Sequence, residues 1–155
     1  MTGAEHEITA LVHEYAFRLD AGDLDGVAAL FEHAELGSTL GPERMRGAVQ
    51  AAANYAGVIR YDDGTPRTMH LLTNVTVHVG EGGTTASGRS YFTVLQQAPG
   101  AALQPIIAGT YHDRFAVIDG AWCFTERIIE PRLSGDLSRH LDPRWIPPTA
   151  SKEAP

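Results

Sequence analysis

The second half of the chain constrains the fold most, because it consists of long β-type segments separated by turns. The second half of residues 67–79 alternates apolar and polar side chains, with Val75, Val77 and Val79 on one face, as a half-buried strand does. Residues 84–97, 104–118 and 121–132 are dense in aromatic and β-branched residues. Glycine-containing turns separate these segments, and the strongest tight-turn signal is Asp119-Gly120. The sequence therefore predicts four long antiparallel strands in succession.

The first half of the chain predicts helices. Residues 5–20 carry apolar side chains at helical spacing, and Thr2 with Glu5 forms a capping-box signature. Asp23 is placed to cap a second, short helix. Its expected buried stripe is Leu24, Val27, Ala28 and Phe31.

Two further elements are expected before the long strands. Residues 33–40 predict a brief strand. Residues 46–59 are rich in alanine and predict a third helix. The face expected to lie against the sheet is Val49, Ala52, Ala53 and Ala56.

This element order is typical of an α+β domain with helices on one side of a curved sheet. Residues 1–141 are expected to form that domain, and residues 142–155 a proline-rich C-terminal tail. From Leu133 onward the chain is rich in Gly, Ser and Pro, which predicts an irregular arm and a disordered end.

Composition narrows the functional class. The 155 residues suffice for one core, with 43% hydrophobic and 20% charged residues. A formal net charge of −7 and scattered basic residues argue against nucleic acid as a partner. No apolar run is long enough to span a bilayer and no signal peptide is evident, so we expect a cytoplasmic protein without membrane contact. Cys123 is the single cysteine, which rules out an intrachain disulfide.

His70 is the first candidate catalytic residue. It lies near the start of a predicted strand and follows the turn-rich residues 61–66, a position that suits a general base. A histidine at a strand start is also a common surface or core residue. Asp20 ends the first helix, where a negative charge opposes the helix dipole. It is either a functional group or the solvent-exposed start of a turn.

Four short segments together carry a family resemblance. They are residues 15–20 (YAFRLD), 67–74 (RTMHLLTN), 109–115 (GTYHDRF) and 122–127 (WCFTER). In this order and spacing they resemble the SnoaL-like branch of the NTF2-like superfamily, which includes scytalone dehydratase, hexachlorocyclohexane dehydrochlorinase and bile acid 7α-dehydratase. The resemblance implies a cone of curved antiparallel sheet, closed by N-terminal helices around a deep pocket.

The resemblance also implies roles for four residues. Asp20 falls on the aspartate that holds the catalytic histidine, and His70 falls on that histidine, which removes a substrate proton. Tyr15 falls where related enzymes place a group that acts on the leaving group. Arg127 falls near their pocket arginine, and strand alternation puts Arg127 on one face with Cys123 and Thr125.

Three further residues are expected to bind substrate: Tyr55, Tyr91 and His112. His112 has an alternative interpretation as part of an exposed strand face. No metal site and no cofactor are expected, because an Asp/His pair suffices for acid–base chemistry.

The leading functional hypothesis is a cofactor-independent lyase of dehydratase type. Its expected substrate is a small apolar, polycyclic or aromatic carbonyl compound. The alternatives are an isomerase, cyclase or epoxide-opening enzyme with the same pocket, or a non-catalytic ligand-binding domain. Apolar residues on the outer face of the sheet predict a homodimer or homotrimer.

Overall fold

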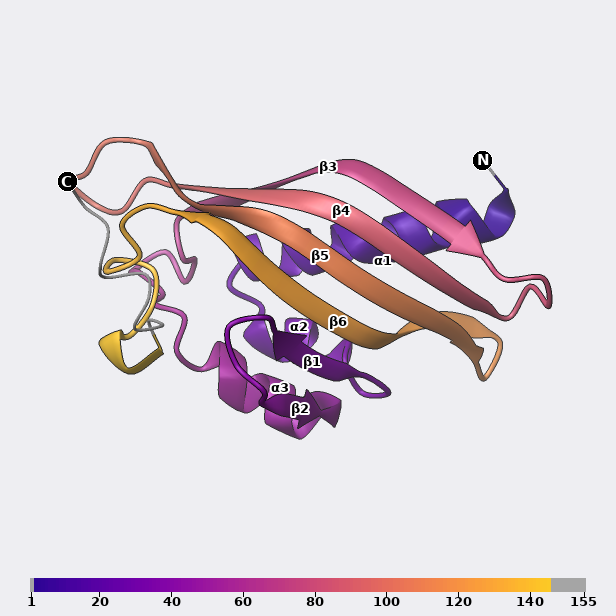
Figure 1. The fold of residues 1–155 in the computed structure, drawn as a ribbon. Coiled ribbons are helices and arrows are strands. Elements are labelled where there is room, and N and C mark those ends of the chain that lie inside the picture. Colours follow the sequence, from indigo (N-terminus) through magenta and orange to yellow (C-terminus); the bar gives the residue numbers. More distant parts are fainter. Residues whose placement is uncertain (1, 146–155) are drawn as a thin grey trace.

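The sheet has six strands in the order β2-β1-β6-β5-β4-β3 (Figure 1). The computed structural model describes residues 2–145. The strands are β1 (Glu35–Ser38), β2 (Arg44–Arg46), β3 (Thr68–Val79), β4 (Thr85–Gln96), β5 (Gln104–Ile118) and β6 (Ala121–Ser134). Strands β3 to β6 form the predicted antiparallel meander, while β1 pairs with β6 in parallel.

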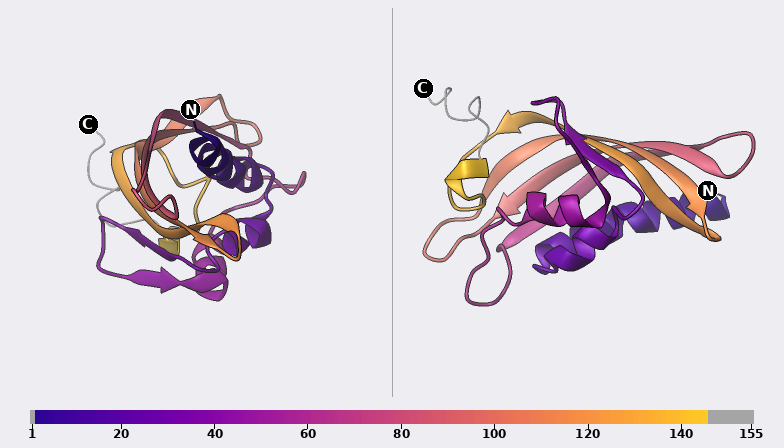
Figure 2. Two further views of the ribbon diagram at one scale, coloured as in Figure 1. Left: turned by 90° about the vertical axis from the view of Figure 1, so that its right-hand side faces the viewer. Right: turned by 90° about the horizontal axis from the view of Figure 1, so that it is seen from below.

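Three α-helices lie on one side of this curved sheet. They are α1 (Gly3–Asp20), α2 (Leu24–Ala29) and α3 (Gly47–Tyr55). The predicted capping box of α1 is present, and Asp23 caps α2 through the backbone N–H of Gly26. Figure 2 shows the long strands curving around α1. The predicted α+β architecture with a curved sheet is therefore confirmed.

The core fills the space between the inner face of the sheet and the helices. Helix α1 contributes apolar residues at helical spacing, and the strands contribute alternate residues. The most deeply buried apolar side chains include Ile8, Val27, Phe31, Leu36, Ile106, Phe115 and Phe124. Among the described residues, no helix is long and apolar enough to cross a membrane.

Of the four residues predicted to form the packing face of the third helix, Ala52 packs against the core, whereas Val49, Ala53 and Ala56 are exposed. Val49 is 85% exposed, whereas Ala51 and Tyr55, one turn apart, are buried. Helix α3 also ends at Tyr55, before the predicted end. A segment so rich in alanine has little contrast in hydrophobicity between its faces, so packing of the large Tyr55 ring into the core decides its orientation.

Strand β2 was not predicted, because the three residues Arg44–Arg46 contain one apolar side chain and no alternation long enough to recognise. It forms by antiparallel pairing with β1. Strand β6 also extends beyond its predicted end and includes Leu133 and Ser134.

The segment after β6 is held by backbone hydrogen bonds. In this C-terminal arm (residues 135–142), Gly135 N–H donates to the carbonyl of Ile106, and Asp142 N–H donates to that of Gly57, each at 2.8 Å. The arm lies at the end of the sheet away from the N-terminus (Figure 1). A short 3-10 helix, η1 (Pro143–Trp145), follows it. The predicted disordered end falls on residues 146–155, outside the described residues.

Candidate functional site

Asp20 and His70 meet where the end of α1 reaches the beginning of β3. The Oδ1 atom of Asp20 lies 2.5 Å from Nδ1 of His70, although the residues are 50 positions apart. Asp20 Oδ2 accepts the backbone N–H of His70 at 2.7 Å, and Oδ1 also accepts the Thr68 hydroxyl at 2.8 Å. These contacts offset the unfavourable position of a carboxylate at a helix C-terminus.

The contacts of Asp20 fix both the orientation and the tautomer of the imidazole. Because Nδ1 faces a carboxylate, it carries a proton, and Nε2 is left as the basic nitrogen. Among the described residues, no group hydrogen-bonds Nε2. The His70 side chain is 4% exposed and that of Asp20 is 21% exposed. The pair is thus a buried histidine held by a carboxylate that retains some contact with water.

His70 lines an apolar cavity of about 180 Å³ between the sheet and the helices. The cavity walls come from α1, α3 and the segment after it, the four long strands β3 to β6, and the C-terminal arm. The lining residues are Tyr15, Leu19, Asn54, Tyr55, Val58, His70, Phe92, Val94, Ile107, Tyr111, Ile129, Leu137, His140 and Leu141.

Two of the predicted substrate-binding residues, Tyr15 and Tyr55, line this cavity. The Tyr55 hydroxyl donates to the Tyr15 hydroxyl at 3.1 Å, and the ring of Tyr15 packs edge-on to that of His70 with centroids 6.5 Å apart. Burial raises the pKa of Tyr55, and of Tyr111 on the opposite wall, well above the usual value. Both hydroxyls therefore stay protonated near neutral pH. One proton of the Tyr15–Tyr55 pair remains free to donate into the cavity.

Arg127 is buried but does not line the cavity. Its guanidinium forms two hydrogen bonds to the carboxylate of Asp113, at 2.8 and 2.7 Å. It lies against the rings of Tyr15 and Tyr111, 4.3 and 4.1 Å from their centroids. Burial alone would lower the pKa of Arg127, but the Asp113 carboxylate outweighs burial and raises it. The arginine is thus a charged support behind the tyrosine rings.

The predicted facing of the last strand was also wrong. Arg127 and Phe124 are both fully buried on the inner side, although simple alternation puts them on opposite faces. The register with β5 shifts here: Arg114 pairs with Glu126, but Phe115 pairs with Phe124. Thr125 is the extra residue of a β-bulge, and a bulge reverses the alternation that follows it.

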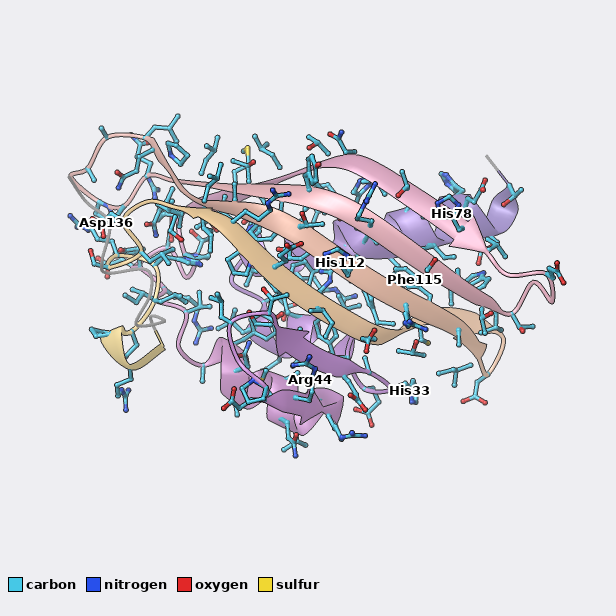
Figure 3. All side chains as sticks on the ribbon, viewed as in Figure 1. His33, Arg44, His78, His112, Phe115 and Asp136 are labelled. Atoms are coloured by element: carbon cyan, nitrogen blue, oxygen red, sulfur yellow. The ribbon has the colours of Figure 1, made fainter. Side chains whose placement is uncertain are left out.

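His112 and Tyr91 lie outside the cavity. His112 is exposed and hydrogen-bonds Glu130 through Nε2 at 2.8 Å; its label lies over β5 and β6 in Figure 3. Tyr91 is 46% exposed and lines a depression on the outer surface of the sheet. Its neighbours Ser90 and Phe92 are buried, so β4 turns the opposite face inward. The expected contact of His112 and Tyr91 with a ligand in the cavity is therefore not supported.

The contribution of the C-terminal arm to the cavity was not predicted from the sequence. Leu137, His140 and Leu141 all line the cavity, and Leu137 and His140 are buried. Leu141 forms a bridge with Val58 of the segment after α3. The sequence offered one indication of this role. Leu137, His140 and Leu141 are close together within a stretch that is otherwise rich in Gly and Ser.

A comparison with known protein families identifies the family of this chain. The family described as "SnoaL-like domain" matches residues 2–128, which include α1, the Asp20–His70 pair and most of the sheet. The chain belongs to the SnoaL-like domain family. The C-terminal arm of this SnoaL-like domain lies beyond the matched residues. A comparison with curated proteins found no match.

Solved structures share the fold of this SnoaL-like domain. A variant of Rv3472 of Mycobacterium tuberculosis, a protein of unknown function, is 26% identical with a TM-score of 0.65, over 82% of this chain and 70% of that chain. An NTF2-like protein with a cystatin-like fold from Novosphingobium aromaticivorans is 23% identical with a TM-score of 0.67, over 86% and 84%. A candidate scytalone dehydratase from the same species is 21% identical with a TM-score of 0.67, over 84% and 85%. The last two, under 25% identical, show the fold alone.

Proposed function

We propose that this SnoaL-like domain is a cofactor-independent lyase that eliminates water from a small carbonyl compound. The observation that carries the proposal is the Asp20–His70 contact, which leaves Nε2 of a buried histidine facing an apolar cavity. SnoaL-like proteins are often enzymes, and the fold is shared with a candidate scytalone dehydratase.

His70 serves as the general base in this proposal. Nε2 takes a proton from the carbon next to the substrate carbonyl, and the electron pair of that C–H bond moves toward the carbonyl oxygen as an enolate forms. The imidazole becomes positively charged. Asp20 stabilises that charge, because its carboxylate is already hydrogen-bonded to Nδ1.

Tyr15 serves as the general acid. The enolate electrons expel a hydroxyl group from the β-carbon, and the departing oxygen takes a proton from Tyr15 to leave as water. Tyr55 supports this step, since its hydroxyl donates to Tyr15 and stabilises the developing phenolate. The proton on His70 then returns to Tyr15 through the released water, which restores both groups.

The cavity favours a small substrate. Its volume of about 180 Å³ is below the roughly 300–1,000 Å³ that is typical of sites for drug-sized ligands. Its walls are mainly aliphatic and aromatic, with polar atoms from Tyr15, Tyr55, Tyr111, Asn54 and two histidines. A one- or two-ring aryl ketone with a β-hydroxyl group fits this description better than a larger polycyclic compound.

The test uses 3-hydroxy-1-tetralone, a two-ring β-hydroxyketone that loses one water and tautomerises to 1-naphthol. Naphthol fluorescence reports the rate above the uncatalysed reaction, and mass spectrometry confirms the loss of water. We expect the native protein to accelerate the reaction and His70→Ala to abolish the acceleration. His112→Ala is the matched control, because His112 lies outside the cavity, and it is expected to keep the native rate.

Three results would contradict the lyase proposal. Native activity in His70→Ala would remove the base from the mechanism. A product of unchanged mass would instead identify an isomerase or cyclase. Binding of the ketone without any turnover, in native protein and variants alike, would identify a ligand-binding domain.

The homo-oligomer stays a prediction. The outer face of the sheet exposes apolar side chains that a second copy would cover, among them Met69 (60% exposed) and Leu133 (71% exposed). We expect sedimentation velocity to give a dimer or trimer, and the double variant Met69→Lys/Leu133→Glu to give a monomer. A monomeric native protein would contradict this expectation.

A further inference from the structure

His140 is a second histidine in the cavity wall, and it has no role in the elimination mechanism proposed above. It lies on the C-terminal arm, is 7% exposed and contributes to the cavity wall together with His70. Its Nδ1 is sealed among protein atoms and has no hydrogen-bond partner among the described residues. Nε2 has no such partner either, but it is not sealed. A buried imidazole without any partner is costly, so it calls for an explanation from function.

The backbone on both sides of His140 is fixed by hydrogen bonds. Ile59 N–H donates to the His140 carbonyl at 2.8 Å, and His140 N–H donates to the Leu137 carbonyl at 3.0 Å. The preceding carbonyl, of Arg139, accepts from the buried amide of Gln96 at 3.0 Å and from the Tyr61 hydroxyl at 2.5 Å. The imidazole is thus held in the cavity wall by contacts of its own backbone with other segments.

The chemical state of His140 suits a hydrogen-bond donor. Burial, and then the proximity of His70, lower its pKa to about 4, so the ring is neutral near pH 7. A neutral imidazole carries one N–H. Placing it on the sealed Nδ1 would bury an unsatisfied donor, so the Nε2–H tautomer is favoured. A neutral imidazole can donate this N–H first to the ketone oxygen and then to the enolate oxygen, where the negative charge strengthens the hydrogen bond.

The other cavity groups leave this role open. Arg127 lies behind the tyrosine rings and does not reach the cavity. The Tyr55 hydroxyl donates to Tyr15, and Tyr15 is the proposed acid. Two competitors remain: Tyr111, with its ring stacked on Phe92 at 4.4 Å between centroids, and the side-chain amide of Asn54, which also lines the cavity.

We propose that His140 is a catalytic residue whose Nε2–H hydrogen-bonds the carbonyl oxygen of the substrate and stabilises the enolate formed when His70 removes the α-proton. This inference rests on the proposed function and deepens it, because it assigns a role to the C-terminal arm. The arm lies beyond residues 2–128, the part of the chain that matches the family. In this step the C–H bond breaks, the proton goes to His70, and the electron pair resides on oxygen without any oxidant or reductant.

The test separates binding of the carbonyl from proton abstraction by using 1-tetralone, which has no leaving group. Infrared spectroscopy of carbonyl-¹³C-labelled 1-tetralone reports the hydrogen bond, since a donor lowers the carbonyl stretching frequency. Deuterium exchange at C2 in D₂O, followed by NMR, reports the base. We expect His140→Phe to lose the frequency shift and to slow exchange about 100-fold or more, the usual effect of removing such a donor.

Four variants serve as controls. His140→Gln keeps a donor near the position of Nε2 and is expected to retain the shift and part of the rate. His70→Ala is expected to lose exchange and retain the shift. Tyr111→Phe and Asn54→Leu are each expected to retain the shift. If His140→Phe keeps the shift, the proposal is overturned, in favour of Tyr111 or Asn54 according to which of their variants loses it.

The remaining outcomes are also decisive. A carbonyl shift without exchange in the native protein contradicts the proposed lyase and leaves His140 assigned to binding the carbonyl. Failure of the native protein to bind 1-tetralone overturns the role of His140 for aryl ketones. If His140→Phe does not fold, ¹⁵N NMR of histidine in the native protein decides: the ketone must perturb the protonated Nε2 of His140, and an unchanged signal overturns the proposal.

Discussion

The Asp20 carboxylate makes three contacts, of which two are structural and one affects the chemistry of His70. The backbone N–H of His70 and the Thr68 hydroxyl tie the carboxylate to β3, whereas the third contact, to Nδ1, acts on the chemistry of the imidazole. One residue thus joins the helix end to the strand and sets the tautomer of the base. Because an amide has one acceptor oxygen, Asp20→Asn keeps at most the contacts of one carboxylate oxygen, and it should cost some stability as well as catalysis.

Asp20→Asn is expected to lower turnover of 3-hydroxy-1-tetralone about 100-fold or more, because an amide cannot stabilise the imidazolium by its charge. Steady-state kinetics measure the effect, and circular dichroism checks that the variant is folded. Thr68→Val removes one hydrogen bond to Asp20 and leaves the contact with Nδ1. Its cost of about 1 kcal/mol corresponds to less than tenfold. Equal losses in the two variants would show that Asp20 acts through structure alone.

His140 links stability to pH. Its pKa is about 4 in the folded protein and near 6.5 in the unfolded chain, so between these values the unfolded chain binds more protons. The free energy of unfolding should fall as pH decreases from 6.5 to 4, by an amount on the order of 3 kcal/mol. Urea denaturation at pH 4.5 and pH 7 measures this. His140→Phe should reduce the difference in the free energy of unfolding between the two pH values. An unchanged difference would show that other groups cause the pH dependence.

Strands β5 and β6 are joined by the buried pair of Asp113 and Arg127. The side chains are 2% and 0% exposed, and their register pairing is direct. The Arg127 Nη1 atom lacks a partner among the described residues, so its N–H donors are buried without hydrogen bonds. Arg127 of this pair packs against the ring of Tyr15, and burying the two charges costs desolvation free energy.

Arg127→Met alone is expected to destabilise the fold by about 3–5 kcal/mol, because Asp113 would be left as an uncompensated buried charge. The double variant Arg127→Met/Asp113→Leu replaces both charges by apolar groups and should recover most of that loss. Urea denaturation of native protein, both single variants and the double variant gives the interaction energy. A double variant no more stable than Arg127→Met would contradict the argument.

The sequence predicted the long strands, α1 and the Asp20–His70 contact, because each depends on a regular pattern or on motifs in fixed order. It did not predict the facing of Arg127, since the bulge at Thr125 arises from the register with β5. It also missed His140. The arm that carries His140 is ordered by backbone hydrogen bonds to distant segments, and such bonds leave no pattern in side chains.

The first helix and the C-terminal arm both contribute to the cavity wall. Helix α1 supplies Tyr15 and Leu19, and the C-terminal arm supplies Leu137, His140 and Leu141 across from the sheet. We therefore expect the arm to limit the entry of water, and a dry site strengthens the hydrogen bonds on which the proposed chemistry depends.

A chain that ends at Ser134 tests this contribution. We expect it to fold, because most of the core residues lie before that position. Without the arm the cavity opens to water, and affinity for 1-tetralone should fall at least tenfold, about 1.4 kcal/mol. Isothermal titration calorimetry measures the affinity. Native affinity in the shortened chain would show that the arm is not part of the binding site.

The irregularity in β3 has a consequence unrelated to ligands. Strand β3 ends one side of the sheet and is 12 residues long, so the part of its edge beyond the contact with Asp20 is a template on which another chain could add a strand. The register shifts between Thr73 and Thr76, and Asn74 has a φ of 54°, a conformation that asparagine tolerates and valine does not. This kink divides the edge into two short pieces, neither straight enough to seed an aggregate. We therefore expect Asn74, which lies outside the cavity, to protect this edge of the folded protein from strand addition.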